Sequence, residues 1–412
     1  MINKLSIRNF KSIKELDIDC ARVNLFIGEP NTGKSNILEA LGLLSWCGCE
    51  GLPLSDFVRF QYTSNLFYDN LTNQISDVRI TRRMTTENIE FNVDLGTTPK
   101  SENYVIYVGK STEQEPFKSF ELKEDHQINL DNEILTDILV YDFAIAGITL
   151  QGQIGISVVK LNHEWLVFDN AKIYSVKKME GRLFAYEYAL NFRALDKFGK
   201  LSDFNKYQHF LKFIKLYQYK RLDEFPDKSI STLIHPYGSN FLSLTMRNSK
   251  IRETTSSLFK NFGFNVMFRE HVETLEQAKI INDVIYSHPY ITVSDTLKRM
   301  IFYNAAIDSN ENSTLVFEEP EVHAFPLYIK ELGEKIAFDE TNQYFIVTHN
   351  PYLFLSIVEK TPKDDVNVFA TYMKDYQTKV KRASHEQISM LMDYDPFANL
   401  GQIIEEDDND SD

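Results

Sequence analysis

The residues with the clearest chemical potential lie near the start of the chain, in Gly28-Glu-Pro-Asn-Thr-Gly-Lys-Ser35. Gly28 and Gly33 allow the backbone to curl until several N–H groups converge on one point, which makes a nest for an anion. Lys34 supplies a mobile cation that can reach β- and γ-phosphates, and the Ser35 hydroxyl can ligate Mg²⁺. This spacing therefore predicts a phosphate-binding loop with ATP and Mg²⁺ as its cofactors.

The sequence on either side of this loop has the pattern needed to hold it. The apolar run from Val23 to Ile27 is typical of a buried strand. A helix is predicted to begin at about Lys34, with its positive end directed at the anion. Its apolar stripe is formed by Ile37, Leu38, Leu41 and Leu44.

A second chemical motif follows at Leu315-Val-Phe-Glu-Glu-Pro-Glu-Val-His323. Three apolar residues predict a buried strand, and ligands bind beyond the carboxyl ends of strands in open α/β sheets. Glu318 would hold hydrated magnesium, and Glu319 would polarise the water that attacks the γ-phosphate. Without the phosphate-binding loop, the same acids would be interpreted as solvated residues at a strand end.

A third motif, Tyr344-Phe-Ile-Val-Thr-His-Asn-Pro351, predicts another buried strand that ends before Thr348 and His349. The imidazole could donate a hydrogen bond to the γ-phosphate and so sense its presence. A single histidine after a strand is usually a polar loop residue. Its position after the acidic motif favours the functional interpretation.

Periodicity divides the rest of the chain. It is mostly strand-like from about Val78 to Tyr188, mainly helical from about Asn191 to Tyr286, and alternates between strand and helix from Thr314 onward. Such alternation indicates a parallel sheet covered by helices. We predict an N-terminal lobe, a mainly helical insertion, a C-terminal lobe and a disordered acidic tail over residues 1–190, 191–286, 287–404 and 405–412.

Composition excludes few functions. The 412-residue chain is 43% hydrophobic and 25% charged, which is ordinary for a folded protein, and its net charge is −15. The N-terminus lacks a signal-peptide pattern and no stretch would span a bilayer, so we expect a cytoplasmic protein without membrane contact.

Nucleic-acid binding would need a local basic patch. Candidates are Arg79, Arg82 and Arg83, and Lys212, Lys215, Lys220 and Arg221, although solvated faces are the simpler interpretation.

Four motifs in order resemble the ATPase heads of the RecF and OLD group, which are ABC-type ATPases related to SMC proteins. These are Ile7-Arg-Asn-Phe-Lys-Ser12, the loop with Ser35-Asn36, Glu-Glu-Pro-Glu-Val-His, and Thr-His-Asn-Pro. Leu233 to Asn240 is also similar to a segment of that group. The resemblance implies an α/β P-loop NTPase of ABC type: a parallel-sheet core lobe, an antiparallel β lobe and a helical insertion.

The resemblance also implies roles for individual residues. Such heads dimerise with ATP sandwiched between protomers, and His349 would be the switch histidine. The segment from Glu321 to Pro326 would cross the dimer interface. The expected nucleotide contacts are Lys11, Asn31, Thr32, Asn36 and the other loop residues.

This sequence departs from the family pattern at two places. Glu318 stands where aspartate is commoner. The best candidate for the signature motif is Ser294-Asp-Thr-Leu-Lys-Arg299, in which Asp295 replaces a glycine and would repel the γ-phosphate. Ser294 could equally be the cap of an ordinary helix. A weak signature predicts slow or partner-stimulated hydrolysis. Gln61 is one candidate for the glutamine that reports nucleotide state.

These features favour an ATPase that assembles with ATP, as a homodimer or higher oligomer, and switches a separate effector. By resemblance, bacterial anti-phage defence is the expected setting. About sixty residues follow His349 and they lack an acidic cluster, so a built-in nuclease is not expected. Two alternatives remain open: a RecF-like ATPase that clamps DNA, and a nucleotide-dependent scaffold with negligible hydrolysis. A transporter subunit fits poorly.

Overall fold

The chain forms two compact units that do not follow its linear order. One, here the core unit, contains Met1, Cys20–Gly48 and Leu211–Asp412, and the other, the β unit, contains Ile2–Asp19 and Cys49–Phe210. The predicted 1–190 lobe thus contributes to both units. The computed structural model describes residues 1–49, 51–72, 74, 76–83, 88–97, 104–112, 118–122, 157–161, 164–169, 172–179, 182–188, 191–195, 197–204, 211–269, 271, 274–393, 396–397 and 400–405.

The core unit is built on a six-stranded sheet with the order β14-β18-β19-β3-β20-β21. All its neighbours pair in parallel except β21, which pairs antiparallel with β20. Parallel strands are buried on both faces, which explains their continuous apolar runs. The bounds are Ile214–Tyr217 for β14, Thr314–Glu318 for β18, Gln343–Val347 for β19, Val23–Gly28 for β3, Val366–Lys374 for β20 and Gln377–Arg382 for β21.

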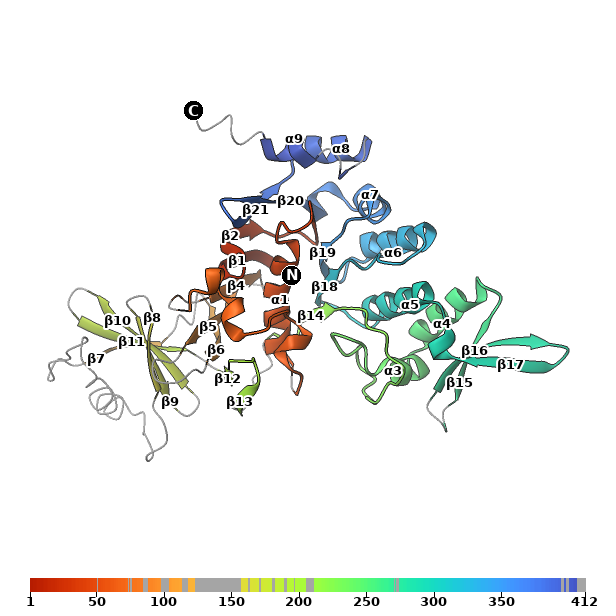
Figure 1. Ribbon diagram of the computed structural model, residues 1–412, viewed down its shortest axis with the longest axis horizontal. Helices are drawn as coiled ribbons and strands as arrows, with labels where there is room; N and C mark the ends of the chain where they lie inside the picture. The colour runs from red at the N-terminus through yellow and green to blue at the C-terminus, as the bar shows by residue number, and fades with distance from the viewer. Residues whose placement is uncertain are drawn as a thin grey trace. The chain divides into compact units, whose positions relative to one another are not determined.

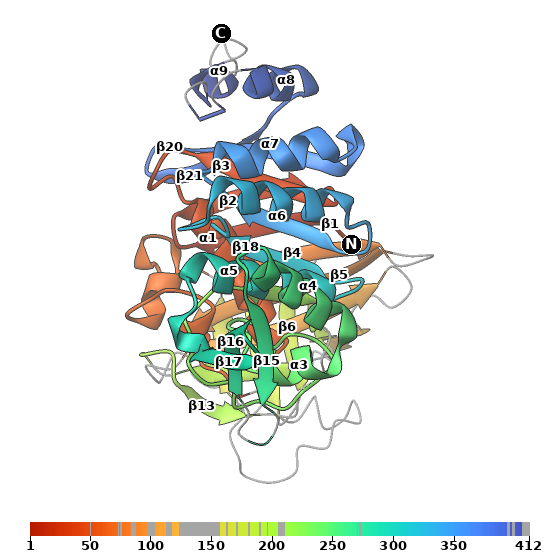
Figure 2. The same cartoon turned by 90° about the vertical axis from the view of Figure 1, so that its right-hand side faces the viewer.

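Helices cover both faces of this sheet. α1 (Lys34–Cys47) lies on one face, against β14, β18 and β19. α5 (Asp295–Asp308), α6 (Pro326–Phe338) and α7 (Pro351–Lys360) lie side by side over the other face (Figures 1 and 2). α8 (His385–Asp393) and α9 (Leu400–Glu405) follow β21. The apolar faces of α5, α6, α7, α8 and α9 join apolar residues of the strands in one core cluster, which includes Leu25, Phe317 and Ile346.

A helical insertion lies between β14 and α5. It contains α3 (Phe241–Arg247), α4 (Ser249–Lys260) and an antiparallel sheet of β15 (Asn265–Arg269), β16 (Thr274–Ile281) and β17 (Val284–Pro289). The prediction of a mainly helical segment over 191–286 was therefore only partly right. The apolar runs of β15 and β16 are short, and short runs do not separate strand from helix by period alone.

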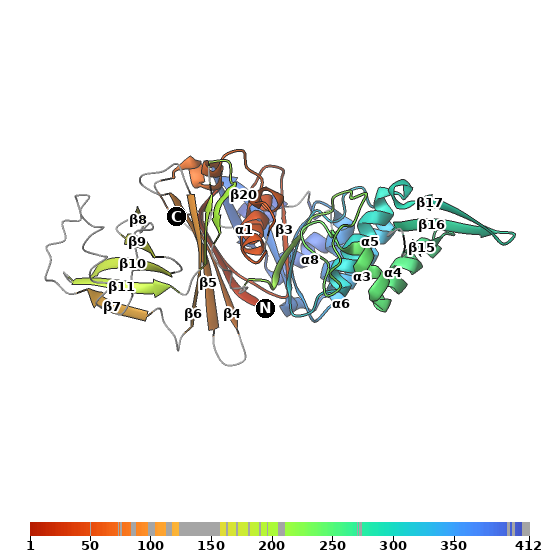
Figure 3. The same ribbon diagram turned by 90° about the horizontal axis from the view of Figure 1, so that it is seen from below.

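The β unit consists of antiparallel sheets, whose strands lie side by side in Figure 3. One sheet has the order β13 (Leu201–Phe204), β12 (Asn191–Leu195), β6 (Tyr104–Thr112), β5 (Asn88–Thr97), β4 (Ser76–Arg83), β1 (Ile2–Phe10) and β2 (Ile13–Asp19). The other has the order β7 (Lys118–Leu122), β11 (Arg182–Tyr188), β10 (Lys172–Met179), β9 (Glu164–Asp169) and β8 (Ser157–Leu161). Three short 3₁₀ helices, Leu54–Asp56, Thr63–Leu66 and Tyr68–Asn70, precede β4.

The expected α/β fold is confirmed: a parallel-sheet core, an antiparallel β lobe and an insertion with helices. Among the described helices, none combines the length and the apolar character needed to cross a membrane. The acidic residues 406–412 lie outside the described residues.

Candidate functional site

The glycine-rich loop connects β3 to α1, as the sequence predicted. A Cβ atom on Gly28 would come within 2.3 Å of the Thr371 carbonyl oxygen on β20, so a side chain cannot fit there. Gly33 caps α1 with φ = 90°, a left-handed conformation that glycine adopts without strain. Both glycines are therefore required by the backbone path that brings the loop to the N-terminus of α1.

The Lys34 side chain lies inside this loop. Its Nζ donates hydrogen bonds to the carbonyl oxygens of Gly28 at 3.0 Å and Glu29 at 2.5 Å, and to Thr32 Oγ1 at 3.3 Å. Burial lowers the pKa of Lys34, while the charges of Glu319 and Glu29 act to raise it. The ammonium is thus held where a phosphate bound to the loop amides would meet it.

The remaining loop residues lie close around it. Asn31 adopts φ = 62°, and the Thr32 hydroxyl donates to the Glu29 carbonyl at 2.9 Å. Ser35 and Asn36 lie in the first turn of α1, and the Asn36 N–H donates to the Gly33 carbonyl at 3.0 Å. This turn is an anion-binding position, and a hydroxyl on it can reach a metal ion beside the phosphates.

Strand register brings the three motifs to one edge of the sheet. β19 lies between β3 and β18, and Val347 pairs with Phe26 on one side and with Glu318 on the other. Parallel strands end at the same edge, so the loop after β3, the acids after β18 and the histidine after β19 are neighbours.

Glu318 accepts a hydrogen bond from a residue that the sequence analysis did not single out. Gln218 follows β14 directly, and its Nε2 donates to Glu318 Oε2 at 3.4 Å. The available signal was a buried run, Ile214 to Tyr217, that ends in glutamine. Gln61 lies in the β unit, where its backbone N–H donates to Asn65 Oδ1 at 3.1 Å.

Glu319 and His349 meet at the end of their strands. His349 Nε2 lies 3.6 Å from Glu319 Oε1. Glu319 has φ = 43°, a left-handed conformation that turns the chain sharply after β18. Burial and the Lys34 charge lower the pKa of His349, and the Glu319 charge opposes them. The imidazole therefore stays neutral down to a lower pH than an unperturbed histidine would.

Glu321 points into the protein instead of towards a partner. Its side chain is buried, and Oε1 accepts hydrogen bonds from Thr348 Oγ1 at 2.7 Å and from the His349 N–H at 3.0 Å. The expectation that the segment from Glu321 to Pro326 crosses a dimer interface stays a prediction, and the side chain of its first residue is buried within the protein. Phe325, in contrast, is 62% exposed.

Ser294 caps α5, because its Oγ accepts a hydrogen bond from the Leu297 N–H at 3.3 Å. Ser294 and Asp295 are both exposed. Thr296 Oγ1 donates to the His323 carbonyl at 2.7 Å, which ties the start of α5 to the loop after the acidic motif. The candidate signature is therefore an accessible helix N-terminus whose serine also serves as a cap.

Lys11 lies in the β unit, at the end of β1, where its Nζ donates to the Arg59 carbonyl at 2.6 Å. Its predicted nucleotide contact remains a prediction.

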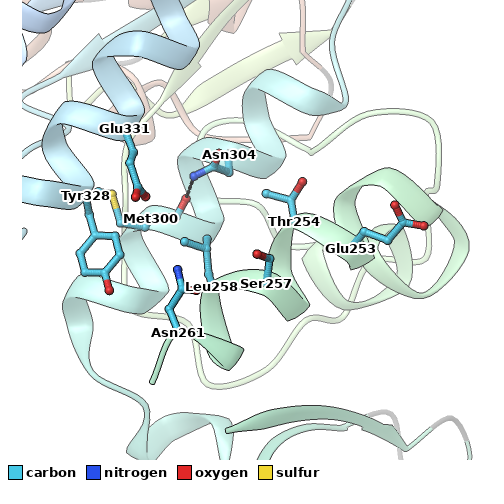
Figure 4. A pocket seen from close by; sticks show the side chains of 9 residues that line it. All are labelled: Glu253, Thr254, Ser257, Leu258, Asn261, Met300, Asn304, Tyr328 and Glu331. Atoms are coloured by element: carbon cyan, nitrogen blue, oxygen red, sulfur yellow. Dashed lines mark hydrogen bonds between the residues drawn. The ribbon is translucent and has the colours of Figure 1, made fainter. Parts of the chain in front are cut away.

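A surface cavity of about 470 Å³ lies between α4, α5 and α6 (Figure 4). Its lining includes Glu253, Leu258, Met300, Tyr328 and Glu331, and none of the predicted site residues contributes to it. The candidate chemistry is therefore at the sheet edge and not in this cavity.

Comparisons with known proteins agree with this geometry. The AAA ATPase domain family matches residues 1–221, more than half of the chain. A stretch of 55 residues is 34% identical to the DNA replication and repair protein RecF of Bacteroides thetaiotaomicron, and it spans 13% of this chain and 15% of that relative.

Two solved structures are similar at low identity. The SMC head domain from Thermotoga maritima is 12% identical with a TM-score of 0.40, covering 93% of this chain and 99% of that one. The SmcHead bound to the C-winged helix domain of ScpA is 14% identical with a TM-score of 0.45, covering 94% and 99%. The family match shows that the chain belongs to the AAA ATPase domain family, and its own strand order gives it the α/β fold of a P-loop protein.

Proposed function

We propose that the chain binds Mg-ATP at the loop from Gly28 to Ser35 and hydrolyses it slowly. The observation that supports this most is the convergence of Lys34, Glu319 and His349 at one sheet edge. Glu319 acts electrostatically on Lys34, and both charges act on His349. Cation, carboxylate and imidazole therefore act on one another at one sheet edge, and phosphoryl transfer to water uses a cation that stabilises the phosphates and a group that positions the water.

In this proposal the loop binds the triphosphate through its backbone N–H groups and the N-terminus of α1. Lys34 then exchanges its bonds to loop carbonyls for bonds to β- and γ-phosphate oxygens. Such charge-assisted bonds are stronger than bonds between neutral groups.

Glu319 would orient and polarise the attacking water, because its carboxylate follows β18 at the same sheet edge as Lys34 and acts electrostatically on it. Neutral His349 donates a hydrogen bond to the γ-phosphate. Its lowered pKa supports this role, since a neutral imidazole adds no charge to the site.

Ser35 and Glu318 are the residues that would hold Mg²⁺. Their hydroxyl and carboxylate oxygens are the hard ligands that Mg²⁺ prefers, and one or two protein ligands beside the phosphates suffice. Gln218 holds one oxygen of Glu318 in place, which supports the fit. Bound Mg²⁺ would neutralise charge on the phosphate oxygens.

We further propose that ATP joins two or more copies, with Ser294 of one copy facing the γ-phosphate of another. Exposure of the α5 N-terminus supports this arrangement. Asp295 would then lie near the phosphates and slow the reaction. Slow turnover suits a switch that controls a separate effector, and anti-phage defence is the setting that we propose.

The DNA-clamp alternative has less support. In the basic cluster after residue 211, Lys215 bonds to Asn310, Lys220 lies over the Tyr237 ring, and Arg221 donates to the Ile291 carbonyl. These side chains make contacts within the protein. Retention of DNA by ATP-bound protein at low salt, lost as salt rises, would favour the clamp instead.

The test of this proposal measures phosphate release and oligomeric state together, with and without Mg-ATP. Wild type should hydrolyse ATP and assemble with it, and Lys34→Ala should do neither. An exposed lysine outside the site gives the matched control, Lys360→Ala, which should behave as wild type. Equal turnover in wild type and Lys34→Ala would contradict the proposal.

A further inference from the structure

Glu321 is a buried carboxylate that the proposed reaction does not use directly. Its residue is only 6% exposed, although it follows two partly exposed acids on the same loop. Burying a carboxylate is unfavourable unless its oxygens find partners. Glu321 therefore needs an explanation beyond the presence of a strand end.

One oxygen of Glu321 organises the segment that carries His349. Oε1 accepts from Thr348 Oγ1 and from the His349 N–H. The Thr348 hydroxyl oxygen itself accepts from the Asn350 N–H at 3.0 Å, so its single proton is committed to Glu321. Three successive residues after β19 are thus fixed by one carboxylate oxygen.

The same loop also fixes Glu319. The Val322 N–H donates to the Glu319 carbonyl at 3.2 Å, and the Ala324 N–H donates to the Glu321 carbonyl at 2.9 Å. These two turns fix the backbone between Glu319 and Glu321. Glu319, Glu321 and His349 are therefore linked in a closed ring. The backbone joins Glu319 to Glu321, Glu321 Oε1 accepts from the His349 N–H, and His349 Nε2 lies 3.6 Å from Glu319 Oε1.

The second carboxylate oxygen, Oε2, indicates that Glu321 does more than stabilise the fold. Glu321 Oε2 is buried and has no hydrogen-bond partner among the residues that the structure describes. An unsatisfied buried carboxylate oxygen lowers stability, and an apolar residue of similar size would avoid that penalty. The acceptor at Oε1 is the one feature that such a replacement would lose.

We propose that Glu321 is a positioning residue that holds the His349 imidazole in register with the Glu319 carboxylate. This inference rests on the proposed function, because the register matters only if these two groups act on ATP. Glu321 acts through the backbone of the histidine segment, so its loss should slow the chemical step and leave ATP binding in place.

The experiment compares wild type with Glu321→Ala, Glu321→Asp and Glu321→Gln. Steady-state hydrolysis gives kcat, and fluorescent-ATP titration gives the nucleotide Kd. Gln keeps an acceptor oxygen at the same reach, so kcat should stay within about threefold of wild type. Ala removes the acceptor and Asp shortens its reach, so kcat should fall at least about tenfold with Kd within about threefold.

The outcomes separate this inference from the function on which it rests. No hydrolysis by wild type would remove the proposed function itself. Hydrolysis by wild type with unchanged kcat in Glu321→Asp would overturn the positioning role alone. A Gln variant as slow as Ala would also overturn it, because a retained acceptor would then not suffice. If Glu321→Ala does not fold, the Asp and Gln variants still decide the question.

Discussion

His349 Nε2 lies 3.6 Å from Glu319 Oε1, and this pair joins two strand ends that are distant in sequence. β18 and β19 are adjacent and parallel, so the residues that follow them must meet. Lys34 acts electrostatically on the histidine from the third strand end. The order of the strands therefore brings the proposed catalytic groups to the same sheet edge, and the loops after the strands set the distances between their side chains.

Gln218 is predicted to affect turnover through its contact with Glu318. Its hydrogen bond holds Glu318, the proposed magnesium ligand. Loss of a group that orients a metal ligand costs about 10- to 100-fold in activity or metal affinity. Gln218→Ala should lower kcat by about tenfold and raise the Mg²⁺ concentration needed for half-maximal rate.

Gln61→Ala is the matched control, because Gln61 is the glutamine that the sequence suggested as a reporter of nucleotide state and it lies in the β unit. It should hydrolyse ATP within about twofold of wild type if the Gln218 bond is the important one. The reverse ranking, with Gln61→Ala slower than Gln218→Ala, would assign the reporter role to Gln61.

Much of the core unit could be predicted from sequence because its strands are short apolar runs that end in chemically distinct residues. β3, β18 and β19 were each recognised in this way, and their motifs predicted the phosphate loop, acid pair and histidine. Strand order could not be derived from the pattern, since β19 lies between β3 and β18 but follows both in sequence.

The less successful expectations involved residues whose role depends on distant partners. Gln218 is an ordinary polar residue after an edge strand until β18 brings Glu318 beside it. The sequence placed Glu321 only in the segment expected to cross a dimer interface and did not indicate its burial, because charged residues are rarely buried. Its hydrogen bonds to Thr348 and His349 are supplied by the fold.

Arg22 is predicted to stabilise the core unit. Its buried guanidinium donates to the carbonyls of Ile336, Ala337 and Asp339 at 3.3, 2.9 and 2.6 Å, at the end of α6. Arg22→Ala leaves these acceptors without donors and should lower the free energy of unfolding by about 3 kcal/mol. Arg22→Lys keeps one positive charge and one donor group at this position, so its free energy of unfolding should fall by less than that of Arg22→Ala.

The measurement for Arg22 is urea unfolding followed by tryptophan fluorescence. The chain has two tryptophans, and Trp46 is fully buried in the core unit. A Trp165→Phe background makes Trp46 the only reporter. Equal unfolding midpoints for Arg22→Ala and its parent would show that the α6 contacts contribute nothing.

Stability should depend on pH through His235. Burial, and to a smaller extent the Lys215 charge, lower the pKa of His235 from 6.5 to about 3, against a hydrogen bond with the Ser45 backbone that acts to raise it. The unfolded chain then takes up a proton near pH 6.5 that the folded chain excludes. Stability is unaffected above pH 6.5 and falls between pH 6.5 and 3, by at most about 1.4 kcal/mol per pH unit.

Melting temperatures between pH 7.5 and 5 test this prediction. Wild type should melt at progressively lower temperature below pH 6.5, and His235→Gln should show a smaller decrease over the same range. Identical pH dependence in both proteins would assign the effect to other groups.

Asp295 is predicted to limit the rate of ATP-driven assembly and hydrolysis. It is exposed in the first turn of α5, where a negative charge favours the helix but would repel a phosphate. Asp295→Gly and Asp295→Asn should both raise kcat by about threefold or more, because both remove the charge. A higher kcat in Asp295→Gly alone would indicate a steric cause. An unchanged kcat in both variants would mean that the signature motif lies elsewhere in the chain.

The most direct test of the central claim is steady-state phosphate release from Mg-ATP by wild type and Glu319→Gln, with nucleotide binding measured on the same samples. Gln keeps the size of the side chain and removes the carboxylate that orients water. The predicted result is a loss of about 100-fold or more in kcat with ATP still bound. Turnover by Glu319→Gln within about twofold of wild type would contradict the account, since the observed hydrolysis would then not come from this site.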